Sequence, residues 1–370
     1  MSKSVKRVVS TDWILHENYD LFLLENTLKA LKANKSVALK WEKSVLSPFF
    51  ADISLAEAES KLPSNPWKNF SRWFSILKQA ETEKICRHLA ISQENSVFLF
   101  SIGQHASKLF LLCPFVEKSH LLFLEPSLPV QIPYETLVEN PRLKEIYGKP
   151  EEDQWKEAAA LEKEAITKAE KIFCISETSR KQVETLYEKK AELIPPCVAD
   201  HIFYESRKED PEYYFISPSL MHYPVWENVV NAFRYIKDKI VFASFDKLPS
   251  EFQTKMQFNE SFTLLASLTE KAILMAKAKA VLSPFRGFDS TAFEALKMGI
   301  PVIASRHNPV ASYITEENGI LMENSSEEEI LAAIFRFEKL SFSRAKGFSN
   351  TASFTREAYR NAIAHIVGNS

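Results

Sequence analysis

Glycine is scarce in this chain, with only 7 among 370 residues. Glycine permits positive φ and close approach of one backbone to another, so its scarcity argues against flexible linkers and against many phosphate-cradling loops. Three of the seven, Gly287, Gly299 and Gly319, lie within residues 280–322, each where one expected element gives way to the next. We therefore expect backbone geometry in this stretch that other residues could not supply.

Other absences narrow the class of protein. No stretch approaches 18 uninterrupted apolar residues, and the N-terminal sequence lacks the apolar core of a signal peptide, so neither a membrane span nor secretion is expected. The formal net charge is −2 without a clustered positive face, which argues against a nucleic-acid partner. The four cysteines are far apart, and we expect free, buried thiols in a reducing cytoplasm.

Several motifs of known chemistry are also missing. There is no Walker loop, no zinc-ligand spacing, no Asp-x-Asp pair and no Ser-His-Asp order with supporting motifs. The sequence therefore predicts no metal site and no bound cofactor.

The patterns that are present favour an α/β fold. Strand-like apolar runs alternate with helical periods throughout, which is typical of mainly parallel sheets. The chain is 45% hydrophobic and long enough for two domains. Polar residues 205–211 mark the expected boundary, giving domains at 1–207 and 208–350, with a last helix near 351–367 that could fold back on the first domain. Residues 41–68 are expected to be irregular, followed by a helix near 69–89.

Residues 280–322 are the most informative part of the sequence. They predict a buried strand, a tight turn, a helix, a second buried strand, a loop and a short strand. The turn reads Ser-Pro-Phe-Arg-Gly-Phe-Asp at 283–289, and Glu294 lies on the helix that follows. The next strand reads Gly-Ile-Pro-Val-Ile-Ala-Ser at 299–305.

This block resembles the donor-nucleotide half of retaining GT-B glycosyltransferases, the large family-4 group (glycosyl transferases group 1). Residues 155–340 follow the family well, and the part before residue 150 follows it only in the order of its elements. The resemblance implies two Rossmann-like domains facing across a cleft, the first on the acceptor side and the second binding the donor. It also implies metal-independent, retaining transfer of a sugar from a nucleotide-diphosphate donor to a glycan, lipid or protein acceptor that the sequence does not identify.

The resemblance also assigns donor-binding residues. Glu294 matches the second glutamate of the family motif, which hydrogen-bonds ribose hydroxyls, although a helix glutamate can simply be solvated. The turn of Gly287, Phe288, Asp289, Ser290 and Thr291 is expected to face the phosphates, because backbone N–H groups at a helix N-terminus attract anions. Capping of the helix by Asp289 or Ser290 is the structural alternative, and both can hold together.

Arg286 and Glu125 are the candidate catalytic residues. Arg286 stands where the family has a glutamate that touches the donor sugar; it could grip a phosphate or a sugar carboxylate, or be a surface arginine without a role. Glu125, after an expected strand, could position the acceptor or balance developing positive charge, or form only a local ion pair.

Three departures from the family pattern support a second hypothesis. Arg286 replaces a glutamate, Asp289 replaces a glycine, and residues 217–228 lack the Arg/Lys pair that reaches the diphosphate in the family. A glycosyltransferase-like binding or scaffolding subunit that has lost its chemistry is therefore the alternative. The aromatic residues of 41–74 could serve an acceptor, a peripheral membrane contact or a partner subunit, or simply packing.

Overall fold

The computed structural model describes most of the chain and forms two compact units, residues 1–194 with 360–370 and residues 195–359. The described residues are 5–11, 19–32, 35–40, 51–54, 96–103, 116–141, 143–144, 150–198, 211–217, 223–244, 256, 260–265, 267–342 and 351–368. The boundary expected at residue 207, the helix expected near 69–89 and most of the aromatic stretch 41–74 lie outside them.

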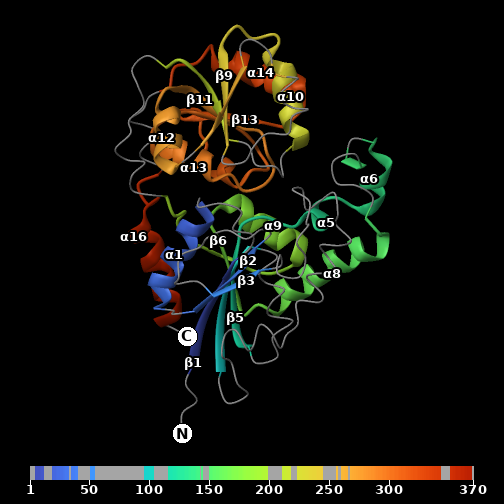
Figure 1. The fold of residues 1–370 in the computed structure, drawn as a ribbon, viewed down its shortest axis with the longest axis vertical. Coiled ribbons are helices and arrows are strands. Elements are labelled where there is room, and N and C mark those ends of the chain that lie inside the picture. The colour runs from blue at the N-terminus through green and yellow to red at the C-terminus, as the bar shows by residue number, and fades with distance from the viewer. Residues whose placement is uncertain are drawn as a thin grey trace. The chain divides into compact units, whose positions relative to one another are not determined.

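The first unit is built on a seven-stranded sheet in the order β3-β2-β1-β4-β5-β6-β7 (Figure 1). Each pairing between neighbouring strands is parallel. The strands are β1 (Val5–Thr11), β2 (Lys35–Lys40), β3 (Ala51–Ser54), β4 (Ser96–Ile102), β5 (Val116–Phe123), β6 (Lys171–Cys174) and β7 (Glu192–Leu193). The prediction of irregular structure throughout 41–68 was wrong at β3, because that short segment gains its hydrogen bonds by pairing with β2 at the edge of the sheet.

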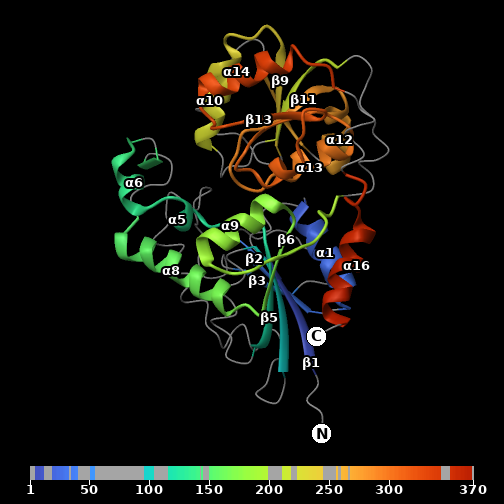
Figure 2. The same ribbon diagram turned by 180° about the vertical axis from the view of Figure 1, so that it is seen from behind.

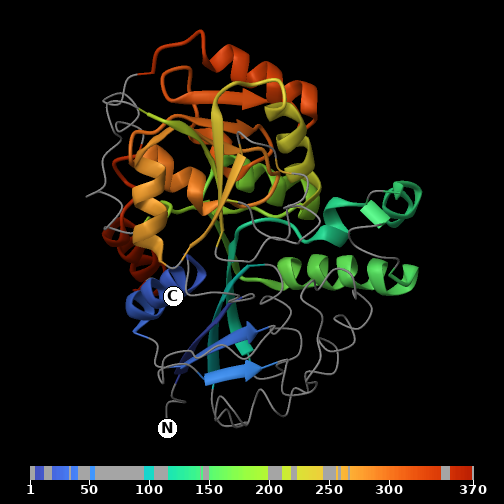
Figure 3. The ribbon, with the colours of Figure 1, turned by 45° about the horizontal axis from the view of Figure 1, so that its top comes forward.

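Helices connect and cover these strands. They are α1 (Tyr19–Leu31), α5 (Leu128–Gln131), α6 (Tyr134–Glu139), α8 (Glu152–Lys168), α9 (Glu177–Tyr187) and α16 (Arg356–Gly368). Figure 3 shows α8 as the long green helix. Ser176 caps α9, accepting a hydrogen bond from the backbone N–H of Ser179 at 3.0 Å. No described helix of either unit is long and apolar enough to cross a membrane.

The C-terminal helix α16 lies beside α1 (Figures 1 and 2). Arg360 Nε donates to Asn26 Oδ1 of α1 at 2.7 Å. The core of this unit includes Cys174, which is free and buried as expected, and burial raises the pKa of its thiol far above the usual range. The buried thiol therefore behaves as a small apolar side chain.

The second unit has a six-stranded sheet in the order β10-β9-β8-β11-β12-β13. Its pairings are also parallel. The strands are β8 (Tyr213–Ile216), β9 (Lys239–Ser244), β10 (Glu260–Leu264), β11 (Ala278–Ser283), β12 (Val302–Ser305) and β13 (Gly319–Met322). All residues of β8 and β12 are buried, as expected for strands covered on both faces.

Helices cover both faces of this sheet (Figure 1). They are α10 (Tyr223–Phe233), α12 (Leu268–Ala276), α13 (Ser290–Lys297) and α14 (Glu327–Phe337), with a short 3₁₀ helix η5 (Pro309–Tyr313) after β12. Ser326 caps α14 through the Glu329 N–H at 3.3 Å. In a capping box the Ser326 N–H would donate in return to the Glu329 side chain, but here it donates to Asn324 Oδ1.

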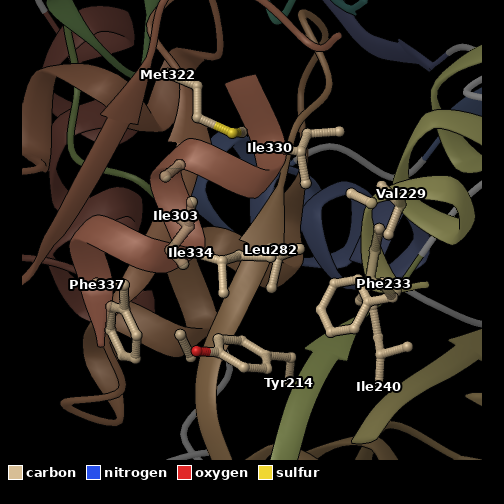
Figure 4. Close-up of a cluster of buried hydrophobic side chains, with 14 of the residues drawn as sticks. Tyr214, Val229, Phe233, Ile240, Leu282, Ile303, Met322, Ile330, Ile334 and Phe337 are labelled. Carbon is tan, nitrogen blue, oxygen red and sulfur yellow. The ribbon is translucent and has the colours of Figure 1, made fainter. Parts of the chain in front are cut away.

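The main core of this unit lies between the sheet and the pair α10 and α14 (Figure 4). Tyr214 is fully buried there, edge-on to the rings of Phe233 and Phe337. Trp226 of α10 is also fully buried. This close packing holds the strands in register and so fixes the loops at their ends.

Two of the three glycines singled out in the sequence occupy positions that other residues would strain. Gly299 has φ 71°, in the left-handed region, and ends the turn after α13. At Gly319 a Cβ atom would lie 2.1 Å from the carbonyl oxygen of Val302, its partner across β12 and β13. The expectation of special backbone geometry is confirmed at these two positions.

Replacing Gly319 by alanine should therefore destabilise the protein by about 2 kcal/mol, in the range of overpacked cores. The clashing atom is backbone, so relief requires β13 to move away from β12. Urea unfolding of Gly319→Ala measures the effect, with Ala332→Gly at an exposed position of α14 as a comparison that removes a methyl group instead of adding one. Wild-type stability in Gly319→Ala would show that the two strands separate freely.

Candidate functional site

The candidate donor site is centred on the turn between β11 and α13, residues 284–289. Pro284, Phe285 and Gly287 are buried in this turn, while Arg286 is exposed. Asp289 is the N-cap of α13, and its Oδ1 accepts a hydrogen bond from the Thr291 N–H at 3.0 Å. The structural alternative of capping by Asp289 is thus confirmed. Because the cap occupies one N–H of the first helical turn, a ligand could use only the others.

A chain of buried hydrogen bonds ties this turn to the loop after β12. Asn308 Oδ1 accepts from the Val310 N–H at 2.9 Å, which identifies the other side-chain atom as the amide nitrogen. That nitrogen donates to Ser283 Oγ at 2.9 Å and to the Phe285 carbonyl at 3.1 Å. Ser283 must then give its own hydrogen to Asp289 Oδ2, at 2.6 Å. The two loops are therefore held as one piece.

Behind this network lies a buried ion pair. Lys271 Nζ of α12 lies 2.5 Å from Glu294 Oε2 of α13, and the side chains are only 3% and 2% exposed. Burial raises the pKa of Glu294, and the positive charge of Lys271 opposes that rise. Burial likewise raises the pKa of Asp289, against the Ser283 hydrogen bond, the Lys271 charge and the Thr291 N–H. The charge of Lys271 thus favours the ionised form of both buried carboxyl groups.

The sequence did not single out Lys271. Its helix reads Leu-Thr-Glu-Lys-Ala-Ile-Leu-Met-Ala, and Lys271 shares a helical face with Ala272, Met275 and Ala276, all fully buried. A lysine on the apolar face of a helix needs a buried partner. The helical periodicity that places Lys271 on this apolar face was therefore the sequence signal that could have revealed it.

Basic side chains gather at the surface of the same two loops. Arg286 follows β11, and Arg306 and His307 follow β12; all three are exposed. Arg306 forms an ion pair with Glu323. Partial burial and the charges of Arg286 and Arg306 lower the pKa of His307, while Glu323 acts in the opposite sense. No described acidic side chain forms an ion pair with Arg286.

The remaining turn residues differ in how far they reach solvent. Phe288 is half-buried and stacks on Phe293 with ring centroids 5.7 Å apart. Ser290 is half-buried at the first position of α13, and Thr291 is buried. Their roles at a phosphate remain predictions.

Glu125 lies in the first unit, on the loop between β5 and α5, and is half-buried. This loop is held by a residue that the sequence did not reveal, the fully buried Glu162 of α8. Glu162 Oε1 accepts from the Ser127 N–H at 3.0 Å and from the Tyr187 hydroxyl at 2.5 Å. Gln131 Nε2 also donates to the Pro126 carbonyl at 2.5 Å. The structure thus fixes the loop that carries Glu125, whose catalytic role remains a prediction.

Comparison with known proteins agrees with this architecture. Residues 226–338 match the family model of glycosyl transferases group 1. No curated protein matches the chain in sequence.

Solved structures resemble the chain over almost its whole length. A sucrose-phosphate synthase from Thermosynechococcus elongatus has a TM-score of 0.69 at 15% identity, covering 98% of each chain. An α,α-trehalose-phosphate synthase (UDP-forming) from Burkholderia xenovorans, in complex with glucose-6-phosphate, has a TM-score of 0.62 at 9% identity, covering 98% of this chain and 99% of that one. HepE from Anabaena, in complex with UDP, has a TM-score of 0.60 at 10% identity, covering 98% of each chain.

At these identities the structural likeness establishes the fold, and the family match adds the sequence pattern of the second unit. The chain therefore has the GT-B fold, and residues 226–338 of its second unit match the family model of glycosyl transferases group 1, in agreement with the resemblance.

Proposed function

We propose that this protein is a retaining glycosyltransferase that transfers a sugar from a nucleotide-diphosphate donor, without a metal ion. The acceptor is a glycan, lipid or protein group. The family match supports transfer of a sugar, and similar structures are described with UDP, or with UDP and glucose. A uridine diphosphate sugar is therefore the first donor to test.

One observation carries the proposal: the buried chain from Asn308 through Ser283 to Asp289. It fixes two loops at the carboxyl ends of β11 and β12, the edge where ligands bind in open α/β sheets. A transferase needs this rigidity, since donors of hydrogen bonds stabilise a departing phosphate only when they are held in place beforehand. A buried polar network is also costly to keep unless every member is satisfied.

Each group of residues has a proposed role. The exposed basic side chains of the two loops, Arg286, Arg306 and His307, face the phosphates. Glu294 accepts hydrogen bonds from the ribose. Because the Glu294 carboxylate is buried against Lys271, a ribose contact requires the Glu294 side chain to turn away from Lys271 on binding, while the hydrogen-bonded turn of residues 284–289 stays in place. Retention arises when a donor phosphate oxygen assists the acceptor hydroxyl on the same face of the sugar, so no protein nucleophile is needed.

Calorimetric titration with UDP, UDP-glucose and other nucleotide sugars tests donor binding. Glu294→Gln should weaken UDP binding about 10-fold, the loss expected for a hydrogen bond to a charged group. Glu328→Gln, at an exposed position in the first turn of α14, is the matched control and should bind as wild type does. Transfer or donor hydrolysis that continues in EDTA, with the anomer followed by NMR, tests metal independence and retention.

If the wild-type protein bound none of the nucleotide sugars in the titrations, the proposal would be contradicted. That outcome would support the binding or scaffolding subunit. Donor binding that Glu294→Gln leaves unchanged would refute the ribose role alone, and would leave the buried ion pair as the function of this glutamate.

A further inference from the structure

We infer that Arg286, Arg306 and His307 form a single subsite for an anionic oxygen group, either the donor diphosphate or an acid group on the sugar. The inference rests on the proposed function and adds to it. Arg286 follows β11, and the other two residues follow β12, so none of the three belongs to the segment 217–228 where the family keeps its Arg/Lys pair. The subsite thus supplies positive charge from the loops after β11 and β12 instead of from that segment.

The geometry comes from the strands. β11 and β12 are adjacent and parallel, with Ser283 paired to Ala304, so the residues after each strand leave the sheet at the same edge. The Asn308 side chain then joins the Phe285 carbonyl at 3.1 Å. Arg286 directly follows Phe285, and His307 directly precedes Asn308. The two loops therefore present these side chains next to one another.

The two arginine charges are accessible to a ligand. Arg286 and Arg306 are exposed, whereas the carboxyl groups beneath them are buried and engaged by Lys271, Ser283 and the cap of α13. The nearby opposing charge at the surface is Glu323, paired with Arg306. Exposed pairs of this kind contribute little and can be shared with a ligand.

Arginine suits the ligand class. A guanidinium presents planar, paired donors that match a phosphate or carboxylate bidentately, and its charge persists at any working pH. Two guanidinium groups beside an imidazole can engage a diphosphate, which carries several negative oxygens. A neutral sugar hydroxyl would leave this charge uncompensated, so the subsite favours an anion.

Titration calorimetry with four variants tests the subsite, using UDP, UMP and inorganic pyrophosphate as probes. Arg286→Gln and Arg306→Gln should each weaken UDP and pyrophosphate binding about 10-fold, and the double variant about 100-fold. Glu323→Gln should strengthen binding about 2- to 5-fold, because it removes the competing charge. A purely structural role for these residues would not produce that gain.

Arg234→Gln is the matched control. Arg234 is an exposed arginine directly after α10, at the opposite edge of the same sheet, where β9 begins. It should leave every affinity unchanged. Circular dichroism of each variant checks that folding is intact.

The two sources of the anion give different patterns. If the diphosphate is the ligand, the arginine variants weaken UDP strongly and UMP little. If an acid on the sugar is the ligand, they weaken UDP-glucuronic acid but affect UDP and UDP-glucose equally little. Wild-type affinity of both arginine variants for all of these probes would overturn the inference, even where the protein binds nucleotide sugars. Pyrophosphate binding that depends on both arginines, in a protein that binds no nucleotide, would retain the subsite and reject the proposed function.

Discussion

Lys271→Met should destabilise the second unit by about 3–5 kcal/mol, the cost of leaving a buried carboxylate without its partner. The side chain of Glu294 is 2% exposed and loses the ammonium group that lies 2.5 Å away. Asp289 loses the same charge, so two buried carboxyl groups remain without a cation. Urea unfolding measures the total loss of unfolding free energy, and faster hydrogen exchange over β11 and α13 would show that the loss is local to these elements.

A double variant separates the ion pair from simple packing. Lys271→Met with Glu294→Met removes both charges, and should recover at least about 2 kcal/mol relative to Lys271→Met alone. Lys277→Met is the exposed control: it breaks the surface pair with Glu212, whose atoms lie 3.3 Å apart, and should cost less than about 1 kcal/mol. Additive losses in the double variant would show that the pair is not coupled.

Acidification from pH 6.5 to 4 should remove about 3 kcal/mol of stability through His120, at 1.36 kcal/mol per unit of pKa difference. His120 is fully buried on β5 and packs against the rings of Phe98 and Phe173, at 4.8 and 5.9 Å between centroids. Burial lowers its pKa from 6.5 to about 4, with help from Lys171 and Lys118.

The sign follows from proton binding. Between pH 4 and 6.5 the unfolded chain takes up a proton at this imidazole and the folded protein does not, so stability falls as pH falls. Across from the ring, Glu170 is 4.0 Å away but 44% exposed, so it compensates a buried imidazolium only weakly.

His120→Leu should flatten this part of the stability profile, whatever its effect at neutral pH. Urea unfolding of both proteins at several pH values gives the slope of the unfolding free energy against pH for each. Other titrating groups contribute equally to both slopes, so the difference between the slopes reports His120 alone. His365→Gln, at an exposed position on α16, should retain the wild-type slope. Equal slopes for wild type and His120→Leu would mean that the folded protein accommodates the charged imidazole.

The sequence predicted the alternation of strands and helices well, because apolar periodicity is a local property. It also predicted which residues surround the turn after β11, since the spacing from Ser283 to Glu294 is fixed by one strand and one helix. It failed at β3, a short edge strand that depends on pairing with β2.

The site itself was harder to predict, because its contacts join distant segments. Glu294 finds Lys271 on the preceding helix, and Asn308 reaches back to Ser283 from the loop after β12. The convergence of Arg286 with His307 has the same origin. Such pairs follow only from the register of adjacent strands, which a single sequence does not display.

The assignment of residues 360–370, which include most of α16, to the first unit has a practical consequence for dissecting this protein. Residues 195–359 form one uninterrupted segment, whereas the other unit is assembled from both ends of the polypeptide. A fragment ending at residue 194 would lack the Arg360 contact to Asn26 and expose the surface of α1 that α16 covers. Excising the inserted segment and rejoining the flanks with a short linker would keep both parts of that surface, and is the better route to a separate first unit.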